Sequence, residues 1–268
     1  MSLQAGLLVA VALESLFPRR PFSTPGLARW GQNLTLLMLG SLLPRLCIPL
    51  GTVSLALLAR QNHWGLFHLA ALPYPASLLI GVVALDGSLY ALHRLFHVIP
   101  LLWRFHQVHH SDLDVDCSTT IRHHPGEELI AQAFLLCVIV ALGVEPSAVS
   151  LWLAIQIMVD ILNHSNLALP EPVDRQLRWL LVSPDMHRIH HSANATESNR
   201  NFGNVLPWWD HLFSTYLRAP EGGQIQMNLG LAHLQSSAEL SLGKLLLLPF
   251  SAPVAAQGGE PSRQRIAG

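Results

Sequence analysis

Long apolar runs, separated by short polar or proline-containing turns, dominate the chain. Five such runs lie at residues 3–17, 32–59, 75–90, 129–143 and 147–162. A helix of about 20 apolar residues crosses the hydrocarbon core of a bilayer. The pattern therefore predicts an all-α bundle of membrane helices, in which the runs 129–143 and 147–162, each short for a full span, form a hairpin of short or tilted helices.

Two of the runs need a closer reading. Residues 3–17 precede Arg19 and Arg20 and carry no cleavage signal, which predicts a short first membrane helix and not a signal peptide. The run at 32–59 contains Arg45 between two prolines. It forms either a tilted helix whose arginine reaches the interface, or a bent pair of shorter helices, and both interpretations stay open.

The pattern changes after residue 165. Residues 165–216 are largely polar, with a short helix expected around 174–182 and an aromatic pair, Trp208 and Trp209, typical of an interfacial anchor. The apolar stretch at 240–250 predicts an interfacial helix. The final residues have the composition of a disordered end.

Composition supports a membrane protein and a nitrogen-rich site. Charged residues make up only 12% of the chain, and its mean hydropathy is +0.36. The net charge of −1 gives no reason to expect nucleic acid as a partner. Three scattered cysteines stand against 15 histidines, which favours imidazole over thiolate as a metal ligand.

Three histidine clusters carry the candidate chemistry. They read H-x-x-x-H, H-x-x-H-H and H-x-x-H-H, at His93, His97, His106, His109, His110, His187, His190 and His191. Histidines four apart share one face of a helix, and imidazole is the commonest protein ligand of transition metals. Eight nitrogens exceed the about four to six positions of one ion, so they predict two ions.

The nitrogen ligands indicate which metal ion the site would bind. Hard ions such as Mg²⁺ would be held by carboxylates, whereas a nitrogen-rich pair with open positions suits iron and O₂. The clusters lie where the apolar helices end, so we expect the metals at one mouth of an apolar bundle that could admit a lipid chain.

Polar residues near the clusters could orient the ligands. Asp86 and Tyr90 share the helical face of His93, and a carboxylate there could accept the second N–H of a ligand imidazole. Asn201 and Asn204 could make similar hydrogen bonds. For Asp86 the alternative is a polar residue that a neighbouring helix satisfies.

The clusters and the sequence around them resemble the fatty acid hydroxylase / sterol desaturase superfamily of integral-membrane di-iron enzymes. The similarity covers about residues 75–217 and includes the segments at 102–106, 120–125, 163–166, 201–204 and 208–215. It implies N-terminal membrane helices at 1–72, a hydroxylase-like catalytic domain at 73–217 and a tail at 218–268.

The resemblance also implies two further ligands. The histidine that precedes proline in the family falls on His124, which leaves His123 as an extra residue, and the histidine of Asn-His-Ser-Asn falls on His164. One departure is Ser214, where the family usually has glycine. It puts the geometry of that turn in doubt, and not the metal site.

Activity, cofactors and partners follow from the same resemblance. It implies hydroxylation or desaturation of an unactivated C–H bond of a lipid, such as a fatty acyl chain or a sterol, by two iron ions and O₂. Zinc is possible in isolated protein. Because no haem or flavin domain is visible, we expect an external electron donor such as ferredoxin or a cytochrome b5-type protein.

Basic residues set the expected orientation. Arg19, Arg20 and Arg29 lie in the first loop and Arg60 is alone in the second, which places the amino terminus outside and the histidines on the cytoplasmic face. The membrane expected is a bacterial inner membrane.

Two alternative functions would use the same histidines: a metal transporter, and a metallohydrolase, although its H-E-x-x-H pattern is absent.

Overall fold

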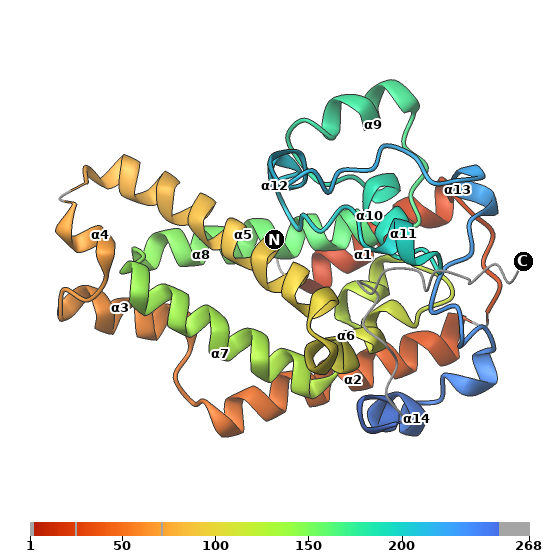
Figure 1. Ribbon diagram of the computed structural model, residues 1–268, viewed down its shortest axis with the longest axis horizontal. Coiled ribbons are helices and arrows are strands. Elements are labelled where there is room, and N and C mark those ends of the chain that lie inside the picture. Colours follow the sequence, from red (N-terminus) through yellow and green to blue (C-terminus); the bar gives the residue numbers. More distant parts are fainter. Residues whose placement is uncertain (1–2, 25, 71, 252–268) are drawn as a thin grey trace, which may run out of the picture.

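The computed structural model describes residues 3–24, 26–70 and 72–251, and within them the chain is helical without a β-strand. Figure 1 shows the α-helices, whose bounds are α1 (Leu3–Leu16), α2 (Gly26–Cys47), α3 (Thr52–Gln61), α4 (Leu66–Leu69), α5 (Tyr74–Val98), α6 (Pro100–His110), α7 (Pro125–Leu142), α8 (Pro146–His164), α9 (Glu171–Leu177), α10 (Pro184–His190), α11 (Ala195–Ser198), α12 (Trp208–Leu212), α13 (Gly223–Gln226) and α14 (Leu242–Leu247). Three short 3₁₀ helices complete the fold: η1 (Cys117–Ile121), η2 (Ser237–Glu239) and η3 (Leu248–Phe250).

Four helical segments are long and apolar enough to cross a membrane. They are Gly26–Leu69, which joins α2 to α4, and the single helices α5, α7 and α8. Their shared core is formed by Leu85 of α5, Ile139 of α7, and Val149 and Trp152 of α8. The predicted all-α bundle with apolar membrane helices is therefore confirmed.

The ambiguous run around Arg45 is a bent pair of helices. α2 ends at Cys47 and α3 begins at Thr52, and both pack against α7. The break contains Pro49, whose ring cannot continue a helical hydrogen-bond ladder. Arg45 lies exposed in the last turn of α2.

The first apolar run, at residues 3–17, forms a short helix. α1 has 14 residues, which is about 21 Å and too short to cross a hydrocarbon core of about 30 Å alone. It packs instead beside the C-terminal half of α8, through Ala10 and Ile161. The Glu14 carboxylate accepts from the main-chain N–H groups of Cys117 at 3.2 Å and Asn166 at 3.0 Å.

The hairpin of α7 and α8 was expected, and Gly143 makes its turn possible. Gly143 caps α7 with a φ of +67°, in the left-handed region that glycine adopts readily. A Cβ there would lie 2.3 Å from the carbonyl oxygen of Trp64. The turn of α3–α4 and the turn of α7–α8 can therefore touch at the end of the bundle opposite the histidines.

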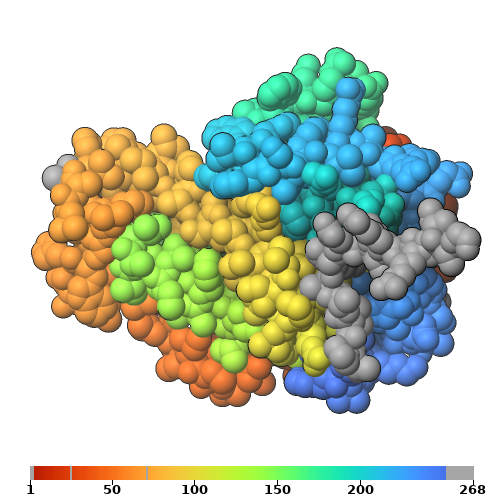
Figure 2. Space-filling model, viewed as in Figure 1, coloured from red at the N-terminus to blue at the C-terminus, as the bar shows by residue number. Residues whose placement is uncertain are grey.

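The remaining elements form a cap at the other end of the bundle. α6 and α9 to α14 gather where α5 and α8 end, from the centre and top of the view to its right (Figure 1). In the space-filling view the blue cap segments cover that side, and the orange helices lie on the left (Figure 2). The helix expected around 174–182 is α9, and 240–250 forms α14 and η3. The predicted disordered end beyond residue 251 lies outside the described residues.

Candidate metal centre

Local sequence signals place the histidine-bearing helices. α5 ends at Val98, and Pro100 occupies the first turn of α6, where a missing N–H costs nothing. The hydroxyl of Ser183, the N-cap of α10, accepts from the N–H of Met186 at 3.3 Å. The clusters thus sit on the end of α5, on α6 and on α10, and His164 closes α8.

The structure brings nine of the ten predicted ligands into two buried groups. Within each group one ligand atom of every residue lies within 4.8 Å of the others. Group A consists of His93, His97, His106, His110 and His190, and group B of His109, His164, His187 and His191. His109 and His110 are neighbours in sequence but belong to different groups, because successive side chains on a helix point about 100° apart.

Group A contains two unprotonated nitrogens that face each other. His93 donates from Nδ1 to the carbonyl oxygen of Phe202 at 2.8 Å, and His190 donates from Nδ1 to that of Arg200 at 2.9 Å. Because a carbonyl only accepts, each Nε2 carries a lone pair in the neutral ring. The two Nε2 atoms lie 2.9 Å apart, an arrangement that is repulsive until a cation lies between them.

Group B repeats this arrangement. His164 donates from Nδ1 to the carbonyl of Asp160 at 2.8 Å, and His109 to that of Arg122 at 3.3 Å. The Nε2 of His164 lies 3.2 Å from that of His109 and 3.0 Å from that of His187. Nitrogens about 2.1 Å from one ion lie about 3.0–3.4 Å apart in octahedral or tetrahedral sites. The residues of both groups therefore fit a bound transition metal.

The electrostatics of the groups favour neutral rings. Burial, and then the neighbouring imidazoles, lower the pKa of His109, His110, His187, His190 and His191 well below the ordinary histidine value. A neutral imidazole is the form that binds a metal. These rings are consequently ready to coordinate without first losing a proton.

His124 does not join either group. As the N-cap of α7 it accepts from the N–H of Gly126 on Nδ1 at 2.9 Å, and it donates from Nε2 to the carbonyl of Leu246 at 3.3 Å. Both ring nitrogens are therefore engaged in local structure. The ligand position that the resemblance assigned to His124 is not met by this geometry.

The neighbouring His123, set aside as an extra residue, lies against group B instead. Its ring stacks on His109, with centroids 4.5 Å apart and an interplanar angle of 14°. Burial would lower its pKa, but Glu127 and Glu128 outweigh that effect and raise the pKa of His123 to about 9. His123 therefore contacts group B through His109 while its Nδ1 lies 3.1 Å from the Glu128 carboxylate.

Glu127 is a functional residue that the sequence analysis missed. The Nδ1 of His106 donates to its carboxylate at 2.7 Å. Such a bond fixes the ring and raises the basicity of its other nitrogen. The only signal in the sequence was a glutamate in the first turn of the helix that follows Arg-His-His-Pro.

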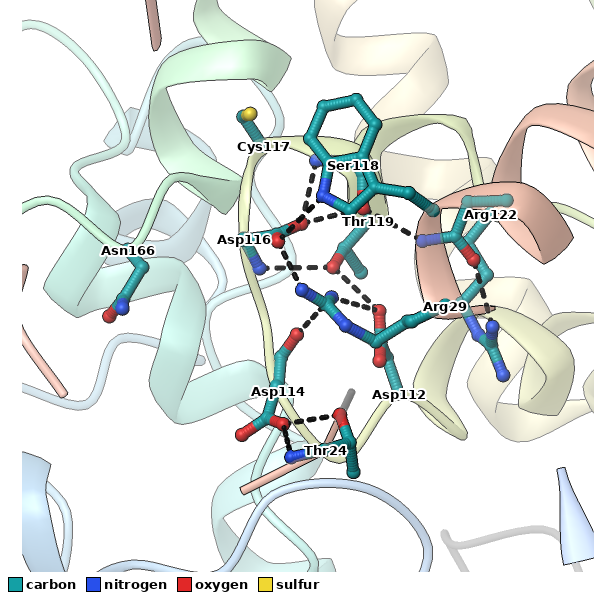
Figure 3. Close-up of polar contacts among 12 residues, drawn as sticks. Thr24, Arg29, Asp112, Asp114, Asp116, Cys117, Ser118, Thr119, Arg122 and Asn166 are labelled. Atoms are coloured by element: carbon teal, nitrogen blue, oxygen red, sulfur yellow. Dashed lines mark hydrogen bonds and ion pairs between the residues drawn. The ribbon is translucent and has the colours of Figure 1, made fainter. Parts of the chain in front are cut away.

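A buried charge network next to group B was also missed (Figure 3). The guanidinium of Arg29 on α2 lies between the carboxylates of Asp112, at 3.1 Å, and Asp116. Arg122 donates to the Asn33 side chain of α2 at 2.8 Å and to the Val108 carbonyl of α6 at 3.1 Å. Since the carbonyl of Arg122 accepts from His109, the network ties α2 to a histidine of group B.

Two of the predicted orienting residues reach the closing segment 201–217 and not a histidine. Asp86 accepts from the indole N–H of Trp209 at 2.8 Å and from the N–H of Leu206 at 3.2 Å. The hydroxyl of Tyr90 bonds that of Thr215 at 2.9 Å. The alternative in which a neighbouring segment satisfies Asp86 is the one observed.

The two asparagines brace the helices that carry the histidines. Asn201 donates to the carbonyl of Met186 on α10 at 3.0 Å and accepts from the N–H of Leu217 at 2.8 Å. The carbonyl of Asn204 accepts from Asn163 on α8 at 3.0 Å. Both therefore act on the ligands through the backbone that positions them.

Ser214, the departure from the family pattern, has a φ of +57°. Glycine enters this left-handed region without strain, which accounts for the residue usual in the family. The turn is held by Asp210, which accepts from the N–H groups of Phe202 and Gly203, each at 2.8 Å, and from the hydroxyl of Thr215 at 2.7 Å.

Known proteins are similar to this chain in sequence. Alkylglycerol monooxygenase of Danio rerio is 27% identical over 189 residues, which cover 70% of this chain and 40% of that protein. Ornithine lipid hydroxylase OlsE of Rhizobium tropici is 33% identical over 150 residues, covering 55% and 44% respectively. Fatty acid hydroxylase vlmA of Lecanicillium sp is 26% identical over 174 residues, covering 60% and 47%.

The chain thus spans less than half of the length of these relatives. No solved structure matches it. The family model described as fatty acid hydroxylase matches residues 78–215, just over half of the chain, and this range includes both histidine groups. The chain therefore belongs to the fatty acid hydroxylase family.

Proposed function

We propose that this chain is an integral-membrane, O₂-dependent lipid hydroxylase that works with two iron ions. The observation that carries the proposal is the pair of buried groups in which unprotonated imidazole nitrogens face each other. The hydroxylase and monooxygenase names of the relatives favour hydroxylation over desaturation.

Each group would hold one ion. Group A offers five imidazoles and group B four, which leaves room for open positions on the second ion, and zinc could replace iron in isolated protein. Bound iron would supply the activation of O₂ and the oxidation of an unactivated C–H bond.

The chain itself orients the imidazole rings and keeps water out of the site. The carbonyl oxygens of Phe202, Arg200 and Asp160 hold the Nδ1–H groups and thereby aim each Nε2 inward. The Glu127 carboxylate does the same for His106. Burial of all nine rings excludes water from the reacting centre.

The substrate we propose is a membrane lipid with a long hydrocarbon chain. A cavity of about 320 Å³ between α1 and α8 is lined almost entirely by apolar side chains, among them Ala10, Met158 and Leu162. It lies at the end of α8 that carries His164. Hydrocarbon is the occupant that such a lining accepts.

Electrons would come from a separate donor of the ferredoxin or cytochrome b5 type. The histidine end of the bundle carries Arg19, Arg20, Arg29 and Arg122, whereas Arg60 lies at the other end. By the positive-inside rule the metal centre would face the cytoplasm, in a bacterial inner membrane.

The test is lipid analysis of cells and membranes with and without the protein, under ¹⁸O₂. Hydroxylation predicts a lipid that is heavier by one ¹⁸O atom and disappears in the His190→Ala variant. A lipid lighter by two hydrogen atoms would make the protein a desaturase. Metal uptake or lipid hydrolysis without O₂ consumption would overturn the proposal in favour of a transporter or a metallohydrolase.

A further inference from the structure

A set of large apolar side chains is exposed on the cap. We call it the aromatic patch; the exposed fractions are 69% for Trp179, 63% for Leu180, 48% for Trp208, 66% for Leu212 and 50% for Phe213. The two parts of the patch, one after α9 and one on α12, are joined because the indole N–H of Trp208 donates to the carbonyl of Trp179 at 2.7 Å. Exposed clusters of this kind mark an interaction surface.

The aromatic patch is continuous with a membrane helix. The ring of Phe213 stacks on Tyr90 of α5, with centroids 5.4 Å apart and an interplanar angle of 15°. Trp209 packs so closely on α5 that a Cβ at Gly87 would lie 2.8 Å from its ring. α12 lies beside α5 in Figure 1. The patch therefore meets whatever surrounds the cap end of α5.

A recess of about 530 Å³ opens next to the aromatic patch, lined by residues of α9 and of the segment 216–224. One wall is a stack of rings in which His211 lies between Trp179, at a centroid distance of 6.2 Å, and Tyr216, at 4.2 Å. Trp179 thus belongs both to the patch and to the wall of the recess.

The recess has an excess of free positive charge. Arg175 and Arg218 line it, and neither side chain has an ion-pair partner among the described residues. Two of its three carboxylates are already paired, Asp174 with Arg178 at 2.7 Å and Asp185 with Arg19 at 2.8 Å. Glu171 alone remains to oppose the two arginines.

We propose that this recess binds the phosphate of an anionic glycerophospholipid while the aromatic patch inserts into the interfacial layer of the bilayer. Arginine suits phosphate because its planar fork bonds two oxygens at once, and tryptophan prefers the membrane interface. The contact would hold the cap against the membrane beside α5. It does not depend on which reaction the metal centre performs.

The headgroup site is tested on purified full-length protein by native mass spectrometry, with phosphatidylglycerol and phosphatidylcholine as probes. We expect the wild type to prefer phosphatidylglycerol, and Arg175→Gln/Arg218→Gln to lower that affinity at least about tenfold. Lys244→Gln, an exposed cation on α14, is the control and should change nothing. Equal binding of the two lipids, or displacement by inorganic phosphate at the lipid's own concentration, would overturn the proposal.

Insertion of the patch is tested separately in nanodiscs whose lipids carry bromine on the acyl chains. Bromine quenches tryptophans that reach the acyl region, so the quenched component of the fluorescence should shrink in Trp179→Phe. The control Trp152→Phe removes a ring that is buried in the bundle core, with 2% exposure. If Trp179→Phe leaves the quenched component as large as Trp152→Phe does, the aromatic patch lies in water. That result would contradict its insertion into the bilayer.

Discussion

The Nε2 atoms of His93 and His190 lie 2.9 Å apart, although the residues are 97 positions apart in the chain. Their Nδ1 atoms both donate to main-chain carbonyls, so two lone pairs point at one another. Such a pair would separate in a protein that had no cation to bind there. The relationship links the end of α5 to α10 and makes metal content the first property to measure.

Replacing His190 by alanine should remove metal from group A, because it takes away one member of the facing pair. We expect the protein to lose about one ion per chain, since a ligand position is lost and the group must bind with fewer nitrogens. Mass spectrometry with an inductively coupled plasma measures this. His124→Ala provides the contrast and should retain both ions, because His124 caps α7; equal metal loss in the two variants would refute the assignment.

Glu127→Gln should weaken the metal held by His106. The substitution removes the charge that accepts from the ring at 2.7 Å, and changes of this kind cost about 10–100-fold in metal affinity. Competition with a chelator gives the affinity. Glu239→Gln, at an exposed position on η2, should behave as wild type. An unchanged affinity in Glu127→Gln would mean that the hydrogen bond does not tune the site.

Arg29→Met should destabilise the fold strongly. It leaves Asp112 and Asp116 buried without their cation, and breaking a buried ion pair costs about 3–5 kcal/mol. Thermal unfolding in detergent measures the effect. The pair of the exposed Arg60 and the partly buried Glu145 is the control, where Arg60→Met should cost about 0–1 kcal/mol.

A rescue experiment separates charge from packing in the same network. Arg29→Met combined with Asp112→Asn and Asp116→Asn removes the uncompensated charges, so part of the lost stability should return. A triple variant as unstable as Arg29→Met would show that the shape of the arginine, and not its charge, stabilises the loop.

The metal-free protein should lose stability in mild acid. The pKa values of His110, His190 and His191 lie well below the ordinary value in the folded chain. Above about pH 6.5 these rings are neutral in both the folded and the unfolded chain, so their protonation does not change the free energy of unfolding. Below about pH 6.5 only the unfolded chain takes up protons. Each such ring should then remove about 1.4 kcal/mol per pH unit until its folded pKa is reached.

Chemical unfolding between about pH 8 and about pH 5 measures this slope. His191→Gln should give a shallower slope, because one buried titrating ring is gone. His233→Gln, at an exposed position, should leave the slope as it is. A stability that stays flat across this range would contradict neutral burial of the histidine groups.

Several features were predictable because they depend on neighbours in the sequence. The spacing of His93 and His97 placed two rings on one helical face, and the apolar run that leads into them predicted a membrane helix. The two short apolar runs at 129–143 and 147–162 predicted the hairpin of α7 and α8. The order of the three histidine clusters indicated the fatty acid hydroxylase family, and that assignment is confirmed.

Only the tertiary structure decided how those residues are used. The direction of each imidazole depends on a hydrogen-bond partner from a distant segment, as for His93 and Phe202, which are 109 positions apart. His123 and His124 are adjacent and look equivalent in sequence, but one stacks on a ligand ring and the other caps α7. The charges of Arg29 and Asp116 meet across 87 positions. Helical periodicity reports only the face on which a side chain lies, whereas packing between helices determines what it meets there.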